Sequence, residues 1–223
     1  MRTRVKICCI ANAAEAKVAI DAGADAIGLV ANMPSGPGPI PDDTIKSICT
    51  ITPPPVSTFL LTSRTTAKSI ADHVQYTGAS TVQIVSHISR DESAELALAL
   101  PNTKRVQVIH VEDENALSLI PVYTDYVDAF LLDSGKPSAE IAELGGTGRT
   151  HDWEISRRFV QQSPRPVFLA GGLNADNIER AITNVKPYGV DLCSSVRTDG
   201  NLDPTKLNRF MRALRRIPID DQI

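Results

Sequence analysis

The sequence predicts an α/β fold in which eight parallel strands alternate with helices and close into a barrel. Eight short segments are rich in apolar and β-branched residues, and helical patterns lie between them. Strands that alternate with helices form parallel βαβ units. The chain of 223 residues is close to the roughly 250 residues typical of a (β/α)8 barrel. Eight repeats favour closure over an open, doubly wound sheet.

The expected strands follow one another along the whole chain. They occupy residues 5–10, 25–30, 56–61, 80–85, 105–110, 127–133, 166–170 and 189–194. Helical patterns between them include residues 13–23, 42–50, 66–78 and 175–183. The first of these ends at Gly23, which suits a helix C-cap. Because no linker interrupts the alternation, residues 1–223 are expected to form a single TIM-barrel domain.

Composition and charge exclude several classes of protein. The net charge of −3 offers no basic face to nucleic acid. No apolar run approaches the roughly 20 residues that span a bilayer, and the apolar stretch near the N-terminus is interrupted at Asn12, which makes a poor signal peptide. We therefore expect a cytoplasmic protein with a small-molecule ligand, no nucleic-acid or membrane partner, and a monomeric or homodimeric state.

The cysteines and histidines give no sign of a metal site. The four cysteines are Cys8, Cys9, Cys49 and Cys193. They lack the spacing of a zinc site, and the four histidines form no ligand pattern. Free thiols in a reducing compartment are the simplest interpretation. We expect neither a metal ion nor another cofactor.

Two long loops interrupt the rhythm of strands and helices. Residues 32–43 form a Pro/Gly-rich loop after the second strand, and residues 134–153 follow the sixth. Both are expected at the carboxyl-terminal rim of the barrel, where barrel enzymes carry their chemistry. The alternative for the second loop is a disordered insertion.

Glycine-containing and hydroxyl-containing turns after the last three strands predict a phosphate site. Glycine lets backbone N–H groups approach an anion, and barrels commonly build this cradle from the loops after strands seven and eight. The predicted phosphate-binding residues are Gly146, Thr147, Gly148, Gly171, Gly172, Leu173, Asn174, Ser194 and Ser195.

Cys8 is a candidate base at the end of the first strand. Side chains alternate along a strand, so Lys6 and Cys8 share one face and Cys9 points to the other. If that face is the barrel interior, the Lys6 ammonium favours the thiolate and makes Cys8 a competent base. The alternative is a buried cysteine that packs as a small hydrophobe. The same alternation makes Cys8 and Cys9 poor partners in a dithiol.

Two aspartates end later strands. Asp133 closes the sixth strand, where partial burial raises a carboxyl pKa and suits a general acid. The alternative is an aspartate that caps the following turn. Asp191 has the same parity as Cys193 in the eighth strand and is expected to face the site and bind substrate with Lys6. A structural salt bridge is the alternative.

These motifs together resemble the phosphoribosylanthranilate isomerase family over nearly the whole chain. The segments that carry the resemblance are VKICCI at residues 5–10, GADAIGLV at 23–30, FLLDS at 130–134, GGTGRTHDW at 145–153, VFLAGGLNADNI at 167–178 and GVDLCSSVRTDGNLD at 189–203. The resemblance implies an Amadori rearrangement in tryptophan biosynthesis. Cys8 matches the family's catalytic base, and Asp133 matches its catalytic acid. No metal or redox cofactor is implied.

The chain departs from the family pattern at several positions. The family has glycine where this chain has Cys9, and its Ser-Pro-Arg is replaced by Ser35-Gly36-Pro37. That arginine is expected to pair with the anthranilate carboxylate. A charge-assisted hydrogen bond contributes about 1.5–3 kcal/mol, so its loss weakens binding roughly ten- to a hundredfold. Lys136, Arg149 and Arg197 are the candidates for a replacement cation.

Further departures lie after the fourth and eighth strands. The family's Gln-Leu-His becomes Gln83-Ile84-Val85, and its Ser-Gly-Val-Glu becomes Ser194-Ser195-Val196-Arg197. Ser195 can crowd the phosphate cradle, with its own hydroxyl or Arg197 as compensation. The departures leave two other hypotheses open. One is a divergent paralogue that isomerises another sugar phosphate, and the other is a non-catalytic barrel that binds a phosphate ligand.

Overall fold

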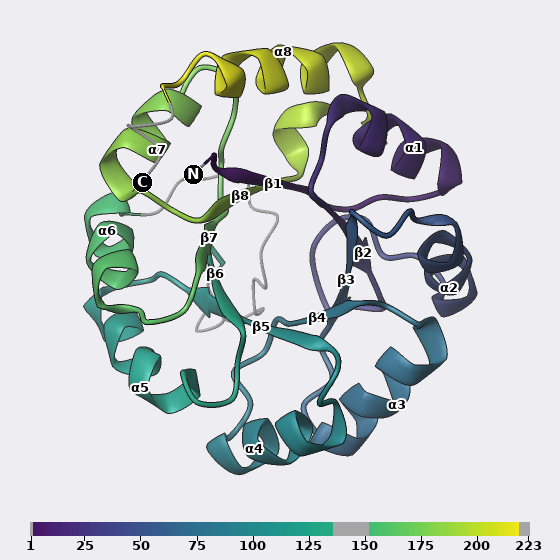
Figure 1. Cartoon of the computed structure of the whole chain (residues 1–223), viewed down its shortest axis with the longest axis vertical. Helices are drawn as coiled ribbons and strands as arrows, with labels where there is room; N and C mark the ends of the chain where they lie inside the picture. The colour runs from purple at the N-terminus through teal and green to yellow at the C-terminus, as the bar shows by residue number, and fades with distance from the viewer. Residues whose placement is uncertain (1, 136–151, 219–223) are drawn as a thin grey trace.

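The protein is a closed barrel of eight parallel strands surrounded by helices (Figure 1). The computed structural model describes residues 2–135 and 152–218. The strands are β1 (Arg4–Ile7), β2 (Ala26–Val30), β3 (Ser57–Thr62), β4 (Thr81–Ile84), β5 (Lys104–His110), β6 (Ala129–Asp133), β7 (Val167–Leu169) and β8 (Gly189–Leu192). Neighbours in sequence pair in parallel, and β8 pairs with β1 to close the barrel. The predicted (β/α)8 fold is confirmed.

The helices form an outer ring around the strands (Figure 1). They are α1 (Ala13–Ala22), α2 (Asp42–Ile51), α3 (Ala67–Thr77), α4 (Arg90–Ala99), α5 (Ile120–Tyr123), α6 (Trp153–Gln162), α7 (Ile178–Val185) and α8 (Pro204–Arg215). Short 3-10 helices lie at η1 (Glu114–Leu119) and η2 (Ser194–Val196). A small hairpin of β9 (Arg197–Thr198) and β10 (Asn201–Leu202) leads into α8. Within the described residues, no helix is both long enough and apolar enough to cross a bilayer.

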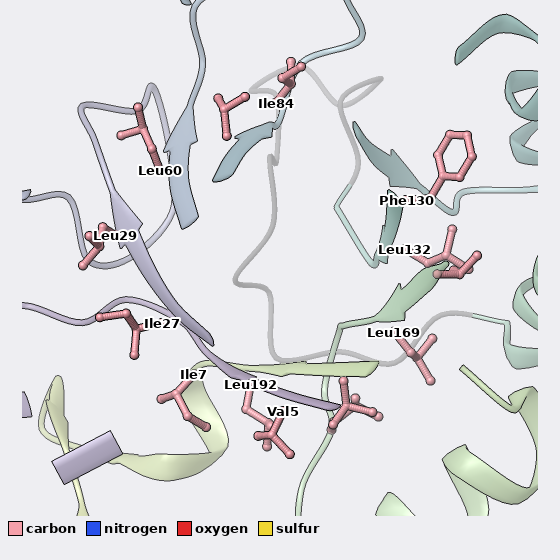
Figure 2. Close-up of a cluster of buried hydrophobic side chains, with 14 of the residues drawn as sticks. Val5, Ile7, Ile27, Leu29, Leu60, Ile84, Phe130, Leu132, Leu169 and Leu192 are labelled. Carbon is pink, nitrogen blue, oxygen red and sulfur yellow. The ribbon is translucent and has the colours of Figure 1, made fainter. Parts of the chain in front are cut away.

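Two apolar layers hold the barrel. Alternate strand residues such as Ile7, Leu29 and Leu132 point outward and pack under the helices (Figure 2). The intervening residues fill the barrel interior with a second cluster that includes Phe59 and Phe168, whose rings meet edge to face. This two-residue alternation is what a strand dictates. It therefore decides which polar side chains face the barrel axis.

Local capping fixes where α1 begins and ends. Asn12 accepts a hydrogen bond from the Glu15 amide at 3.0 Å, which satisfies one of the free N–H groups of the first turn. Gly23 takes a left-handed conformation with φ of 98° and ends the helix, as predicted. These two caps set the two ends of α1, which follows β1 after residues 8–12.

The end of β1 differs from the sequence-based prediction. The predicted strand at residues 5–10 ends at Ile7, and Cys9 takes a left-handed φ of 61°. Alternation therefore stops before Cys9. The prediction that Cys9 points away from the interior is wrong, because its side chain joins the interior cluster together with Cys8.

We expect replacement of Asn12 by alanine to destabilise the protein by about 1 kcal/mol, because the amide of Glu15 loses its partner. Urea denaturation measures this change. The control is Asn208→Ala on the exposed surface of α8, which should change the free energy of unfolding by less than about 0.5 kcal/mol. Equal losses in both variants would contradict the capping role.

Candidate active site

The carboxyl-terminal ends of the strands surround a cavity at one mouth of the barrel. Residues in or directly after all eight strands contribute to its wall. Met33 and residues 35–37 of the loop after β2 complete it on one side. Parallel strands bring their carboxyl ends to the same mouth, where barrel enzymes carry their catalytic groups. This cavity is the candidate active site.

Most of the described residues predicted for the site line this cavity. They are Cys8, Asp133, Gly171, Gly172, Leu173, Asp191, Ser194 and Ser195. Asn174 is not part of the wall, because its Oδ1 accepts hydrogen bonds from the amides of Asp176 and Asn177 in the turn before α7. The predicted phosphate ligands Gly146, Thr147 and Gly148 lie outside the described residues.

A buried ion pair lies beside the cavity. The Lys6 ammonium donates to Oδ2 of Asp191 at 2.7 Å, and the Lys6 side chain is completely buried. The two residues are direct register partners on β1 and β8. The salt bridge considered as the alternative for Asp191 is therefore present, and the role of Asp191 in substrate binding stays a prediction. Its Oδ2 holds the lysine, and the residue also lines the cavity.

Gly28 on β2 leaves the space that this pair and Cys8 occupy. A Cβ atom at this position would lie 2.8 Å from Sγ of Cys8 and 3.1 Å from Nζ of Lys6. The ammonium and the thiol therefore lie over the same backbone position. Since Cys8 is almost completely buried but still reaches the cavity wall, a glycine opposite it is a steric requirement.

The pKa values of the charged groups follow from burial and from one another. Burial opposes the charge of Lys6, but the interactions with Asp191, Cys8 and Cys9 together outweigh burial and raise the lysine pKa. Burial raises the pKa of Asp133, and the Ser134 amide and the Lys6 charge offset this only in part. Burial also raises the pKa of Asp191 despite its lysine partner. Asp133 therefore lies in surroundings that favour the neutral acid.

Three polar atoms of the cavity-lining residues are buried without a hydrogen-bond partner among the described residues. They are Oε1 of Gln83, Oδ1 of Asp191 and Oγ of Ser195. A buried polar group without a partner costs about 1–3 kcal/mol. A polar ligand in the cavity would satisfy such atoms. Sequence reasoning did not select Gln83 as a site residue, although its inward parity on β4 was a usable signal.

Arg197 is not available as a replacement cation. Its guanidinium pairs with Glu15 at 3.1 Å and donates to the carbonyl oxygens of Gly200, Cys8 and Cys9. Glu15 in turn accepts from backbone amides at Ala11 and Leu202. The hypothesis that Arg197 compensates for the lost arginine is wrong. Instead, Arg197 holds the backbone at Cys8 and Cys9 through its hydrogen bonds to their carbonyl groups.

The fold and the site together define a class of protein. A closed (β/α)8 barrel with a carboxyl, a thiol and glycine-containing turns at its carboxyl-terminal mouth has the arrangement of a barrel enzyme. The family model described as N-(5'phosphoribosyl)anthranilate (PRA) isomerase matches residues 5–213. The chain belongs to this family of aldose–ketose isomerases.

Individual relatives agree with this assignment. The chain is 35% identical to N-(5'-phosphoribosyl)anthranilate isomerase 2 of Methanosarcina mazei, covering 93% of this chain and 92% of the relative. It is 33% identical to the isomerase of Halobacterium salinarum, with 97% of each chain covered.

Solved structures are similar over the same extent. Phosphoribosylanthranilate isomerase from Thermotoga maritima superposes with a TM-score of 0.81 at 27% identity, over 96% of this chain and 98% of that one. An isomerase in complex with reduced 1-(o-carboxyphenylamino)-1-deoxyribulose 5-phosphate gives a TM-score of 0.79 at 25% identity, with the same shares covered.

We expect Asp133→Asn to be more stable than the wild type at pH 7, by roughly 0.5–2 kcal/mol, the range typical of stabilising substitutions. The raised pKa means that the folded state holds this proton more tightly than the unfolded state. The stability of the wild type therefore falls as the pH rises from the unfolded pKa of 3.8 through the folded pKa. Below this pH range the stability advantage of Asp133→Asn disappears. Thermal unfolding between pH 3 and pH 8 measures it.

Asp25 provides a control of opposite sign. Burial raises its pKa, but hydrogen bonds from Arg2 and the Val5 amide outweigh burial, and the net pKa is lowered. Its contribution to stability is present above its unfolded pKa and is lost as the pH falls through the folded one. Asp25→Asn should therefore destabilise the protein at pH 7. A loss of stability at pH 7 in Asp133→Asn would contradict the raised pKa.

Proposed function

We propose that this protein isomerises N-(5'-phosphoribosyl)anthranilate in tryptophan biosynthesis, with Cys8 as general base and Asp133 as general acid. The observation that carries the proposal is that a thiol and a carboxyl line one cavity in a chain of this family. Cys8 follows β1 and Asp133 ends β6, and these strands are not neighbours in the barrel. The two groups can therefore reach a bound sugar from different sides.

Asp133 begins the reaction in this proposal. A neutral carboxyl donates its proton to the ribose ring oxygen, the bond from C1 to that oxygen breaks, and a protonated Schiff base forms with the anthranilate nitrogen. The raised pKa of Asp133 suits a group that must carry a proton near neutral pH. The Ser134 amide donates to Oδ1 of Asp133 at 2.7 Å and orients the carboxyl.

Cys8 completes the rearrangement. Its thiolate takes the proton from C2, which gives an enolamine, and the enolamine tautomerises to the ketone. The Lys6 ammonium lies close to the sulfur, on the same face of the barrel. It would balance negative charge at this end of the cavity during proton transfer. No step of this scheme calls for a redox cofactor.

The part of the cavity wall that follows β7 and β8 suits the phosphate. Gly171 and Gly172 both have left-handed φ values, of 82° and 63°. Because glycine has no Cβ atom, no side chain covers the backbone at these two positions. Ser194 and Ser195 begin the short helix η2 after β8. This arrangement of a glycine turn and a short extra helix after strands seven and eight is a common barrel phosphate site. The Ser195 hydroxyl, which has no partner within residues 2–135 and 152–218, is a further donor.

Asp191 and Gln83 are proposed to bind the sugar. Each has a buried side-chain oxygen without a partner among the described residues, and both line the cavity. Such oxygens accept hydrogen bonds from ribose hydroxyls. Lys6 is completely buried and acts through Asp191, whose carboxylate it holds in place. Lys6 is therefore a positioning residue in this scheme.

A second candidate function follows from the part of the cavity that would bind the aromatic acid of the substrate. No arginine is among the described residues that line the cavity, and the loop after β2 contributes Ser35, Gly36 and Pro37 there. An isomerase for another sugar phosphate would use the same acid, base and phosphate cradle without an anthranilate carboxylate. Comparison of kcat/KM for phosphoribosylanthranilate with that for other phosphosugars separates the two candidates.

We expect the purified protein to convert phosphoribosylanthranilate without an added cofactor, followed by substrate fluorescence. Cys8→Ser and Asp133→Asn should each lower kcat by about 10²–10⁴-fold, the usual contribution of a general acid or base. Cys49→Ser, which changes a half-buried cysteine on α2, is the matched control and should retain wild-type kcat. Full activity of either site variant would refute its assigned role. Phosphosugar binding without any turnover would indicate a non-catalytic barrel.

Ser195→Ala tests the phosphate end separately. Removal of one hydrogen bond to a charged ligand group should raise KM about tenfold with little change in kcat, because the bond is made equally in the ground state and the transition state. Ser118→Ala, at an exposed site in η1, is the control. A lowered KM in Ser195→Ala would indicate that the side chain crowds the phosphate instead.

A further inference from the structure

Three of the four cysteines gather at one side of the cavity mouth. Cys8 and Cys9 follow β1, and Cys193 follows the neighbouring strand β8. All three line the cavity. The Sγ atoms of Cys9 and Cys193 lie 2.8 Å apart although the residues are 184 positions apart in sequence. Cys193 therefore meets Cys9, and Cys9 also interacts with the neighbouring Cys8 thiol.

Backbone conformation creates this contact. The β1–β8 ladder continues past the strands with a 2.7 Å hydrogen bond from the Cys8 amide to the Leu192 carbonyl. Simple alternation would then turn Cys9 away from the cavity. The left-handed φ of 61° at Cys9 redirects its side chain onto Cys193. A non-glycine residue in this region costs about 1–2 kcal/mol, so a contact at this position has to compensate for local strain.

The surroundings give the two sulfurs different exposure. The loop after β2 covers Cys9, because a Cβ atom at Gly38 would lie 2.7 Å from Cβ of Cys9, and Sγ of Cys9 lies 3.6 Å from the Pro37 carbonyl oxygen. Cys193 is more exposed. The hydrogen bond with Cys9 lowers the pKa of Cys193; burial opposes this shift and the Arg197 charge adds to it. Cys193 is thus the accessible, more nucleophilic thiol.

We propose that Cys9 and Cys193 are a site of reversible disulfide formation at the mouth of the active site, with a small peroxide as the oxidant. The Cys193 thiolate attacks one peroxide oxygen, the O–O bond breaks, and a sulfenic acid and hydroxide form. The Cys9 sulfur then displaces the sulfenic oxygen as water. Overall, two thiols and hydrogen peroxide give one disulfide and two water molecules. A dithiol reductant reverses the reaction.

The native backbone already suits this bond. Neighbouring strands hold the two residues, and the sulfurs need to approach by less than 1 Å to reach the roughly 2.05 Å of a disulfide. The bond would link the first strand of the barrel to the last. A covalent link across so long a stretch of chain restricts the unfolded state strongly. It should therefore stabilise the oxidised protein without unfolding the barrel.

The test uses the reduced full-length chain treated with hydrogen peroxide. After the remaining thiols are alkylated, intact mass should show the loss of two hydrogen atoms, and non-reducing peptide mapping should join the Cys9 and Cys193 peptides. Cys49→Ser is the matched control and should form the same bond. Cys9→Ser and Cys193→Ser should each lose it, and dithiothreitol should restore the original mass. These readouts do not depend on turnover, so they stand even if the isomerase assay fails.

Thermal unfolding supplies the second readout. The oxidised wild type should melt at least about 4 °C higher than the reduced protein, and oxidised Cys193→Ser should show no rise. A disulfide that includes Cys8, or oxidation to sulfinic and sulfonic acids without a linked peptide, would overturn the proposal. So would a lower melting temperature of the linked protein, because it would show that the native backbone does not accept the bond.

Discussion

The ion pair between Lys6 and Asp191 is the constraint on which the site depends. It joins the first and last strands of the barrel at 2.7 Å, and the lysine is fully buried. The same contact therefore links the strands that close the barrel and contributes charge to the site. Two buried charges are costly to desolvate, and removal of either partner leaves the other uncompensated. The same ammonium offsets part of the burial effect at Asp133 and lies over Gly28 beside the Cys8 sulfur. Asp133, the Cys8 thiol and the Asp191 carboxylate therefore share one lysine as an electrostatic neighbour.

Strand alternation explains why much of this site could be predicted from the sequence. Eight apolar segments predict the barrel. Two-residue parity puts Lys6 on the same strand face as Cys8 and Asp191 on the same face as Cys193, while Asp133 follows from its position at the end of the sixth strand. Because parallel strands in a closed barrel share one carboxyl-terminal mouth, residues at strand ends are brought together whatever their separation in the chain. The turns at Gly171 and Ser194 follow from the same rule, and both line the cavity.

The sequence-based predictions fail at residues where regular secondary structure ends. Cys9 leaves the strand in a left-handed conformation, which a parity argument does not anticipate in a non-glycine residue. Asn174 is engaged by the turn in which it lies. Arg197 looked like a free cation, but its partners include Glu15 and the Cys9 carbonyl, both far away in sequence. A sequence shows which residues are charged. The side chain or carbonyl group that pairs with such a charge depends on packing between distant segments.

Several of the departures from the family pattern lie close together in the molecule. Cys9 and Arg197 lie along the seam between β1 and β8, where Cys9 also meets Cys193. Arg197 donates to the carbonyls of Cys8 and Cys9. In a close-packed barrel, a larger side chain on one strand has to be accommodated by its hydrogen-bonded neighbour. Cysteine in place of glycine at position 9 fits because Cys193 offers a small, polarisable partner and because Arg197 holds the bent backbone. Asp133 on β6 lies away from this seam, so the seam can change while the surroundings of this carboxyl stay the same.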